Sequence, residues 1–459
     1  MSVVSAAGAW LLQAAEVPAI SSGDTAWVMV STALVALMVP GLAFFYGGLV
    51  KSKSALNTML MSLGAFAIVT VQWVLFGYSL AFSPGSNWIG GLEFLGFAGV
   101  TATPNPTYAG ALPHVLFAAF QAMFAGVTVA LFSGAIIDRM RFGAFLLFGA
   151  IWTTLVYDPL AHWVWGDGGW LRVLGALDFA GGTVVHISAG TTAVVLALVL
   201  GPRRDFKRVP TVPHNVPFAL LGAGLLWVGW FGFNAGSALA ADGIAANALM
   251  TTHAAAAAGL ITWISLEALK GGRATAVGAA TGAVVGLVAI TPAAGFVTPL
   301  SALAIGVLAA PCSFFALHYR ATTRLDDTLD VFACHGVAGI MGALLTGVFA
   351  TKTVNPNGAD GLLAGNAALV GVQLLAVVAT ITFAAISSWL ILTALKAIMP
   401  LRVPVATEVQ GIDLVEHGEE AYHGSDLSDL TGRRTALGDA VVLTRNELMR
   451  VPRASSEPA

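Results

Sequence analysis

Charged residues are scarce in this sequence. Asp, Glu, Lys and Arg make up 10% of its 459 residues, whereas soluble domains carry about 25%. Hydrophobic types make up 57%, so the chain has too few polar side chains to cover a soluble surface of its size. Because lipid solvates apolar side chains and the backbone must then bond internally, the composition indicates an all-α integral membrane protein.

Cysteines and basic blocks are also missing. The two cysteines, Cys312 and Cys334, both lie in apolar sequence and cannot form a disulfide framework. The formal net charge is −3 and no cluster of basic residues occurs, which argues against nucleic acid as a partner. No H-E-x-x-H or similar spacing occurs, so we expect no metal, no cofactor and no enzymatic activity.

Long apolar runs are what the sequence does contain. A spanning helix needs about 20 apolar residues, and runs of that kind predict about eleven spans. They lie at roughly 27–49, 56–82, 113–137, 142–164, 178–201, 217–238, 243–269, 275–295, 298–318, 329–350 and 366–396.

The basic residues predict the orientation, because cytoplasmic loops collect Lys and Arg. With eleven spans and an outer N-terminus, only Arg172 and Lys352 of the basic residues before the tail fall outside. Those that fall inside are Lys51, Lys53, Arg139, Arg141, Arg203, Arg204, Lys207, Arg208, Lys270, Arg273, Arg320, Arg324, Lys396 and Arg402. We therefore predict that the N-terminus is outside and the C-terminus inside.

The two ends of the chain differ from the apolar middle. Residues 1–23 are predicted to be an N-terminal leader, and the absence of a basic n-region favours an uncleaved leader over a signal peptide. Residues 24–403 form the predicted transmembrane domain. Residues 404–459 are polar and predict a cytoplasmic regulatory tail, of which about the last 15 residues have a disordered composition.

Two polar signatures reveal an internal repeat. His186-Ile-Ser-Ala-Gly190 in the fifth span and His335-Gly-Val-Ala-Gly339 in the tenth both read H-x-x-A-G. An aspartate, Asp178 or Asp327, stands eight residues before each histidine. Spans 1–5 and 6–10 therefore look like two halves, and the odd number in each half makes them inverted, with an eleventh span outside the repeat.

The repeat places both histidines near the middle of the membrane. Eight helical residues rise about 12 Å, which is close to half of an apolar core about 30 Å thick. Apolarity alone would begin the tenth span near Phe332 and leave His335 shallow. The repeat predicts an earlier start and two histidines facing one another.

Ionisable residues inside spans are functional candidates, because their burial in lipid is expensive. Burial favours neutral imidazoles, and two neutral rings can share one proton. The residues alone leave three roles open for the two histidines. They could only fix a helix crossing, they could line a pathway for a proton or a small polar molecule, or they could form a metal site together with Asp178. Asp178 itself is either a helix N-cap or a charge that attracts cations.

Aromatic residues offer a second candidate site. Phe117, Phe120 and Phe124 lie on one face of the third span, and Trp163 and Trp165 fit an interfacial belt. A packed stripe explains the phenylalanines, and so does binding of a cation by aromatic faces, worth up to about 2 kcal/mol when desolvated. Periodicity does not choose between these explanations.

Six motifs, which occur in the same order along the chain as in a known family, give the chain its resemblance to that family. They are Gly41-Leu-Ala-Phe-Phe-Tyr-Gly-Gly48, Ala119-Phe-Gln-Ala-Met-Phe-Ala125, Ala161-His-Trp-Val-Trp-Gly166, Asp178-Phe-Ala-Gly-Gly-Thr-Val-Val-His186, Gly229-Trp-Phe-Gly-Phe-Asn-Ala-Gly-Ser237 and Asp330-Val-Phe-Ala-Cys-His-Gly-Val-Ala-Gly-Ile340. With them the chain resembles the ammonium transporter (Amt/Mep/Rh) family, and its Amt/Mep branch in particular, from about Asp24 to Tyr422.

The resemblance implies a role for each matching position. Phe124, Trp165 and Ser237 would recruit ammonium, and Phe124 with Phe233 would form a stacked gate beneath it. His186 and His335 would be the twin histidines of an ammonia-conducting pore, and Asp178 would support the recruitment site. The resemblance also implies a multi-pass protein of the cell membrane that assembles as a homotrimer in lipid.

The tail motif Gly411-Ile-Asp-Leu-Val-Glu-His-Gly-Glu-Glu-Ala-Tyr422 is similar to one that couples family members to a PII-type signal protein. Residues 426–459 match no family pattern.

Two alternatives stay open beside transport by the Amt type. They are an Rh-like neutral gas channel, against which Trp165 and the tail argue, and an ammonium sensor that signals through its tail.

Overall fold

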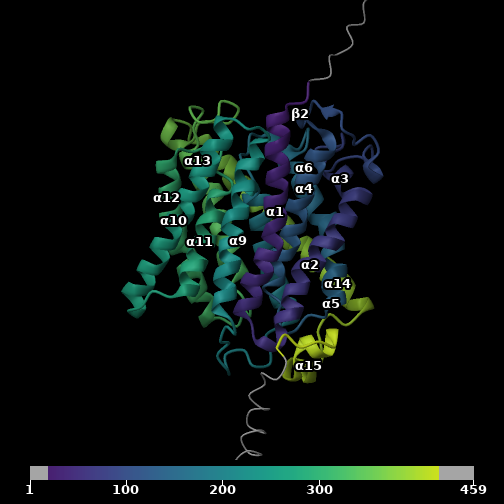
Figure 1. The fold of residues 1–459 in the computed structure, drawn as a ribbon, viewed down its shortest axis with the longest axis vertical. Coiled ribbons are helices and arrows are strands. Elements are labelled where there is room, and N and C mark those ends of the chain that lie inside the picture. Colours follow the sequence, from purple (N-terminus) through teal and green to yellow (C-terminus); the bar gives the residue numbers. More distant parts are fainter. Residues whose placement is uncertain (1–18, 423–459) are drawn as a thin grey trace, which may run out of the picture.

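The computed structural model describes residues 19–422, which form one bundle of long helices (Figure 1). Most of the predicted leader lies outside this range, and so does the part of the predicted tail after residue 422. Ten helices of the described residues are long and apolar enough to cross a membrane, which confirms an all-α membrane protein. The described ends lie at opposite ends of the bundle, with the start of α1 beside β2 at one end and α15 at the other.

The first half of the bundle contains the spans up to residue 200. Its elements are α1 (Ser22–Leu49), α2 (Ala55–Gln72), α3 (Tyr78–Phe82), β1 (Pro104–Asn105), β2 (Ala109–Pro113), α4 (His114–Ser133), α5 (Phe142–Trp152), α6 (Asp158–Trp165), α7 (Trp170–Val173) and α8 (Ser188–Leu200). The first half also contains three π-helical turns. The turn η2 (Trp73–Gly77) joins α2 to α3, and η4 (Thr153–Tyr157) joins α5 to α6. The turn η5 (Gly182–Ile187) begins the span that continues as α8.

The second half contains the remaining spans and the start of the tail. Its elements are α9 (Val216–Ala235), α10 (Gly243–Gly271), α11 (Ala276–Ile290), α12 (Pro299–Thr322), the π-helical turn η7 (Phe332–Val337), α13 (Ala338–Phe349), α14 (Ala368–Ile398), α15 (Val405–Gln410) and the π-helical turn η9 (Asp413–His417). Short 3-10 turns lie at η1 (Ser52–Ser54), η3 (Leu95–Phe97), η6 (Gly236–Ala238) and η8 (Leu362–Ala364).

A helix stands at each of the eleven predicted positions, but one is short. α11 has 15 residues, about 22 Å of rise, against an apolar core of about 30 Å. Turns continue the segment from Thr291 to Phe296. The sequence predicts eleven full-length spans, whereas the described residues contain ten long apolar helices and one shorter apolar helix.

The two halves of the repeat meet at η5 and η7. Both turns are π-helical, and each contains one of the two histidines. A Cβ on Gly190 would lie 2.3 Å from the backbone nitrogen of Gly336, and one on Gly339 would lie 3.1 Å from the carbonyl oxygen of Gly182. Glycine allows this close approach because it has no side chain. The repeated H-x-x-A-G motif therefore lets two spans cross in contact at the histidines.

The start of the tenth span differs from the prediction. The repeat predicts a helix from residue 329, but the helical turns begin next to Phe332, as apolarity alone suggests. His335 is nevertheless 3% exposed. The preceding loop is itself buried, with Asp326 and Asp327 fully enclosed, so a helix that begins late still carries its histidine deep into the protein.

α1 and α9 pack side by side along the centre of the bundle and join its two halves (Figure 1). A Cβ on Gly222 of α9 would lie 2.2 Å from the backbone nitrogen of Phe45, and one on Gly48 of α1 would lie 2.5 Å from the carbonyl oxygen of Asn215. Small residues of this kind allow helix backbones in membranes to approach closely. Two glycines of the sixth-span motif join this contact, since a Cβ on Gly229 or Gly232 would lie 2.7 Å from the carbonyl oxygen of Leu34 or Ser31.

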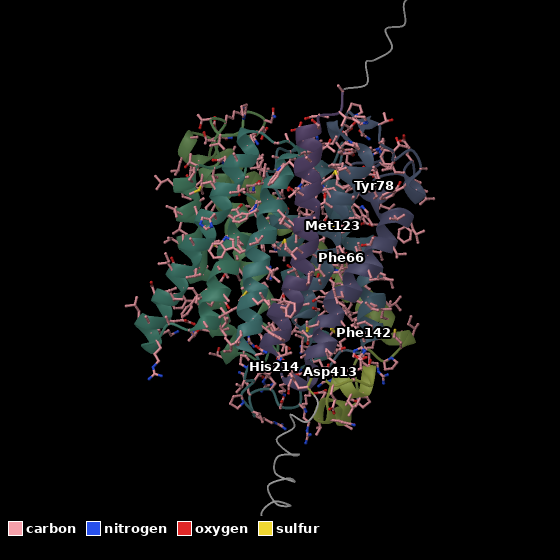
Figure 2. All side chains as sticks on the ribbon, in the orientation of Figure 1. Phe66, Tyr78, Met123, Phe142, His214 and Asp413 are labelled. Atoms are coloured by element: carbon pink, nitrogen blue, oxygen red, sulfur yellow. The ribbon has the colours of Figure 1, made fainter. Side chains whose placement is uncertain are left out.

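The tail closes one end of the bundle, which we call the tail end; the other is the hairpin end, where β1 and β2 pair. The Asp413 carboxylate accepts hydrogen bonds from the backbone N–H groups of Leu56 (2.9 Å) and Asn57 (2.8 Å). Asp413 therefore caps the N-terminus of α2 from outside that helix. Figure 2 places Asp413 and His214 together at this end.

Candidate functional site

A hollow of about 210 Å³ lies at the hairpin end of the bundle. We call it the aromatic hollow, because rings and neutral polar groups dominate its lining. The lining residues are Phe82, Thr107, Tyr108, Phe117, Gln121, Phe124, Val164, Trp165, Arg172, Phe179, Ser237 and Leu239. They come from α3, α4, α6, α7, η6 and the connecting loops, so distant parts of the sequence meet here.

The three residues that the resemblance singles out for recruitment share this hollow. The rings of Phe124 and Trp165 lie 6.2 Å apart at 83°, and Trp165 Nε1 donates to the carbonyl oxygen of Asp178 at 2.9 Å. Ser237 Oγ donates its proton to the carbonyl oxygen of Phe233 at 2.8 Å. Its lone pairs are thereby left as acceptors. The hollow thus offers ring faces and a hydroxyl acceptor, which suit a small cation with N–H groups.

Gln121 adds an acceptor that the sequence analysis did not single out. Its Oε1 is buried without a hydrogen-bond partner, and the side chain lines the hollow. A buried carbonyl oxygen without a donor is costly. The oxygen is therefore a ready acceptor for a donor that enters the hollow. Gln121 stands one helical turn before Phe124 within the motif Ala119–Ala125, and that spacing is the signal from which it could have been found.

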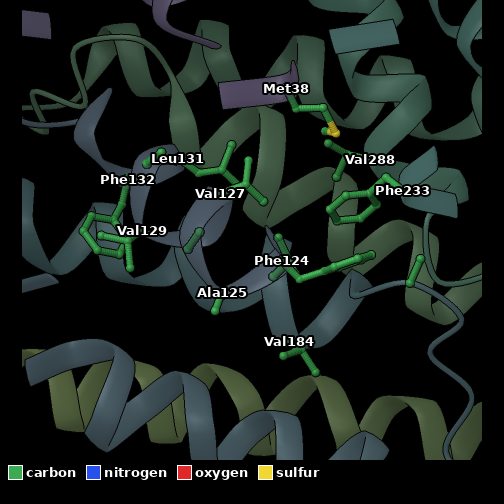
Figure 3. Packing of buried hydrophobic residues seen from close by; sticks show 14 of the residues in the cluster. Met38, Phe124, Ala125, Val127, Val129, Leu131, Phe132, Val184, Phe233 and Val288 are labelled. Atoms are coloured by element: carbon green, nitrogen blue, oxygen red, sulfur yellow. The ribbon is translucent and has the colours of Figure 1, made fainter. Parts of the chain in front are cut away.

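Two stacked rings close the floor of the hollow. Phe124 and Phe233 lie 4.2 Å apart between centroids, with an interplanar angle of 30°, and both are buried (Figure 3). Phe124 lines the hollow, whereas Phe233 lines a second cavity below it. The ring pair therefore separates the two spaces, and a molecule could pass only if a ring moved.

The second space, which we call the narrow cavity, is small and apolar. It measures about 10 Å³, and its walls are Met38, Leu42, Phe45, Val127, Leu131, His186, Leu226, Trp230, Phe233, Val284 and His335. About 10–15 Å³ is the least that holds one water molecule. The cavity therefore has no room for an ion with its hydration shell.

The two histidines lie against each other in the wall of this cavity. Their Nδ1 atoms are 3.3 Å apart and the rings are nearly parallel, with centroids 5.3 Å apart. One Nδ1 must carry the proton and the other accept it. The Trp230 ring stacks on His186 at 5.4 Å, and His186 Nε2 is buried without a partner. A ring nitrogen is thus available to a guest in the cavity.

Asp178 acts as an N-cap and does not line the hollow. Its carboxylate accepts from the N–H groups of Gly181 (2.7 Å), Gly182 (2.6 Å) and Thr183 (2.7 Å), and also from the Thr183 hydroxyl. The carboxylate holds the start of η5, and its carbonyl oxygen holds Trp165. The described residues contain no group of three potential metal ligands, at Asp178 or elsewhere.

The three phenylalanines on one face of α4, Phe117, Phe120 and Phe124, differ in what they contact. Phe117 stacks on Tyr108 from the hairpin loop at 5.3 Å, and Phe120 packs edge-on against Phe124 at 4.9 Å. Phe117 and Phe124 line the hollow, whereas Phe120 does not. Phe120 therefore packs among other rings, whereas Phe117 and Phe124 both pack against neighbouring rings and line the hollow.

A model of the Ammonium Transporter Family matches residues 26–422. The chain belongs to this family. The match confirms the resemblance found in the sequence, and relatives of the chain carry the same name. The ammonium transporter of Bacillus subtilis (strain 168) is 50% identical over 404 residues, which cover 88% of this chain and 99% of that protein.

Solved structures show the same fold within the family. The crystal structure of Saccharomyces cerevisiae Mep2 has a TM-score of 0.79 and 39% identity, and the match covers 84% of this chain and 91% of Mep2. A structure described as a sensor Amt protein has a TM-score of 0.80 and 30% identity, over 86% of this chain and 98% of that one. The chain is therefore a multi-pass membrane protein with the architecture of this family.

Proposed function

We propose that the chain transports ammonium across the cell membrane by binding the ion in the aromatic hollow and passing ammonia through the narrow cavity. The distribution of Lys and Arg places the hairpin end outside, so the hollow would face the medium. The family assignment supports the substrate class. The arrangement of a cation-binding hollow, a ring barrier and a cavity too small for a hydrated ion supports the mechanism.

The observation that carries the proposal is the change of environment across the ring pair. Above Phe124 and Phe233 lie ring faces, a hydroxyl and an amide oxygen, and below them lies an apolar cavity whose polar groups are the rings of His186 and His335. Moving a bare cation into such a cavity costs many kcal/mol, whereas neutral ammonia enters as an uncharged guest. The barrier therefore separates a site for the ion from a site for the neutral molecule.

Deprotonation would explain how potassium is rejected. In ammonium, one N–H bond breaks, the electron pair stays on nitrogen, and the proton passes to water in the hollow. Potassium has similar size and charge but no proton to release. His186 and His335 would orient the ammonia through the free Nε2, or relay the proton between their Nδ1 atoms.

Current recordings on reconstituted protein test the proposal. Pulses of ammonium should produce saturable transport, by current or by internal pH change, and equal pulses of potassium should produce none. A current would favour passage of net charge, and a pH change without current would favour the Rh-like neutral alternative. Potassium conduction by the wild-type protein would contradict the proposed mechanism.

The double variant His186→Ala, His335→Ala tests the cavity assignment. Removing both rings enlarges the narrow cavity and removes the ring nitrogens from its wall, including the unpartnered Nε2 of His186, so we expect altered ammonium flux and weaker exclusion of potassium. Trp389→Leu, on a part of α14 with the indole 54% exposed, serves as the control for general damage. Unchanged flux together with unchanged potassium exclusion would remove the histidines from the pathway.

A sensor is the second candidate, because the sensor Amt protein shares the fold over most of this chain. In a sensor, ammonium would occupy the same hollow and the signal would leave through the tail. Deleting residues 405–459 separates the two functions. Transport should persist without the tail if the chain is a transporter, whereas a pure sensor would show no saturable flux with the tail or without it.

A further inference from the structure

One charged side chain lines the aromatic hollow, and it is positive. Of the twelve lining residues, Arg172 is the only one with a formal charge. Arg172 stands on α7, in the loop between the fourth and fifth spans. A site that binds cations would gain affinity from an acidic residue and loses it through a basic one. The arginine therefore needs an explanation that recruitment does not supply.

The position of Arg172 is held by the binding residue itself. Its Nη1 donates to the carbonyl oxygen of Trp165 at 2.8 Å, and Trp165 Nε1 in turn donates to the carbonyl oxygen of Asp178. The guanidinium thus lies against the backbone of the residue whose ring would bind the ion. Among the ion pairs formed by the described residues, none involves Arg172, so its charge is not neutralised by a carboxylate in contact.

A fixed charge discriminates by valence. The repulsion between Arg172 and a cation is proportional to the charge of the cation. The binding free energy of a divalent ion is therefore reduced by twice as much as that of a monovalent ion. Ring faces, Ser237 and Gln121 provide no such distinction, because they attract a divalent ion more strongly than a monovalent one. A positive group at the wall therefore opposes a divalent cation more than a monovalent one, in addition to the larger dehydration cost of the divalent ion.

We propose that Arg172 is a specificity-determining residue that keeps divalent cations out of the aromatic hollow at the cost of some affinity for ammonium. The inference rests on the proposed function, because it assumes that ammonium binds in this hollow. It adds a residue and a selectivity that the family assignment does not contain.

Methylammonium uptake by Arg172→Gln tests the charge. At low ionic strength, loss of the repulsion should lower the apparent KM about threefold, which corresponds to charges separated by several ångströms of a largely aqueous hollow. The inhibition constant of Ba²⁺ should fall by about the square of that factor, roughly ninefold, because the ion carries two charges. Arg172→Lys keeps the charge and should stay close to wild type in both constants.

Lys352→Gln is the matched control. Lys352 is the other basic residue predicted on the outer side, and it does not line the hollow. Its neutralisation should leave both constants unchanged. Equal changes in the Lys352 and Arg172 variants would overturn the proposal in favour of a general surface charge. If Arg172→Lys behaves like Arg172→Gln, the hydrogen bond to Trp165 matters and the charge does not, which also overturns it.

The wild-type protein provides a test that needs no variant. Raising the ionic strength with N-methyl-D-glucamine gluconate screens the repulsion, so the apparent KM for methylammonium should fall as salt rises. A hollow governed by acidic groups would show the opposite trend, and that result would contradict the proposal. Absence of saturable uptake in the wild type would overturn the proposed function itself, whereas normal uptake with no effect at Arg172 would overturn only this inference.

Discussion

Trp165 links most of the interactions around the aromatic hollow. Its ring faces the Phe124 edge, its Nε1 binds the Asp178 carbonyl oxygen, and its own carbonyl oxygen binds Arg172. The side chain is therefore oriented before any ion arrives, so binding loses little conformational freedom. A belt tryptophan that only faced headgroups would not need these fixed contacts.

Trp165→Leu should weaken substrate binding without unfolding the protein. Loss of one ring face removes about 1 kcal/mol of cation binding, which raises the apparent KM for methylammonium about fivefold. Uptake kinetics in cells or vesicles measure this change, with Trp389→Leu as the control at an exposed position of α14. If KM and maximal rate both stay at wild-type values, Trp165 has no part in recruitment.

At the scale of elements, the crossing of η5 and η7 depends on glycine. The two H-x-x-A-G motifs place Gly190 against the backbone of Gly336, and that contact brings His186 and His335 within 3.3 Å. A side chain at the crossing would push the spans apart, and the histidine pair would separate with them. The repeat in the sequence is thus explained by packing as well as by chemistry.

Gly190→Ala should destabilise the bundle, because its Cβ would lie 2.3 Å from a backbone nitrogen. Overpacking of this kind costs about 1–3 kcal/mol. Gly224→Ala is the matched control, since a Cβ there meets nothing within 4 Å and alanine is the better helix former. Thermal unfolding in detergent should show a lower midpoint for Gly190→Ala than for Gly224→Ala, and equal midpoints would show that the crossing adjusts freely.

The tail is attached to the bundle at the N-terminus of α2. Asp413→Ala removes two hydrogen bonds to that terminus, a cap worth about 1 kcal/mol. The attached state should then open about five times more often. Limited proteolysis within residues 405–422 measures this opening. Glu420→Gln, an exposed position, should digest like wild type, and equal digestion of the Asp413 variant would mean that the tail is held elsewhere.

At the scale of the whole molecule, an ion-pair network joins the loops of the tail end. Asp326 accepts from Arg203 Nε and Nη2, both at 2.9 Å, and lies 3.8 Å from Arg139 Nη1. The Asp138 carboxylate lies 3.6 Å from Arg203 Nη1. These residues belong to loops after three different spans, so the network ties together parts of the bundle that are distant in sequence.

Asp326→Asn should destabilise the protein by about 3–5 kcal/mol near pH 7, because it leaves the buried Arg139 without a carboxylate and Arg203 with Asp138 alone. Burial alone would raise the pKa of Asp326, but the hydrogen bonds and charges of Arg203 and Arg139 outweigh it and lower the pKa below its ordinary value. A lowered pKa stabilises the fold above about pH 4, and this contribution disappears as the pH falls through the folded value.

Thermal unfolding against pH measures both effects. The difference between wild type and Asp326→Asn should be constant from pH 7 to about pH 4 and shrink below that range. Asp205→Asn removes a carboxylate that is 30% exposed, so it should cost about 1 kcal/mol or less. A difference that grows as the pH falls would show that Asp326 does not act as a buried carboxylate.

The sequence by itself determined the class of the molecule, because apolar runs of spanning length and the sorting of Lys and Arg are local properties of the chain. It also singled out His186, His335, Phe124, Trp165 and Ser237 as candidates, because two of them recur in a repeat and the others lie in motifs of a known family. Helix positions followed within a few residues for the same reason.

Only the tertiary structure decided what depends on contacts between distant segments. The unpartnered Oε1 of Gln121 and the burial of His335 behind the enclosed loop at Asp326 and Asp327 depend on what neighbouring segments place around them. Two of the π-helical turns, η5 and η7, contact each other and contain the histidines, and α11 ends where turns begin at Thr291. Periodicity predicts where a helix runs, but packing decides what its side chains meet.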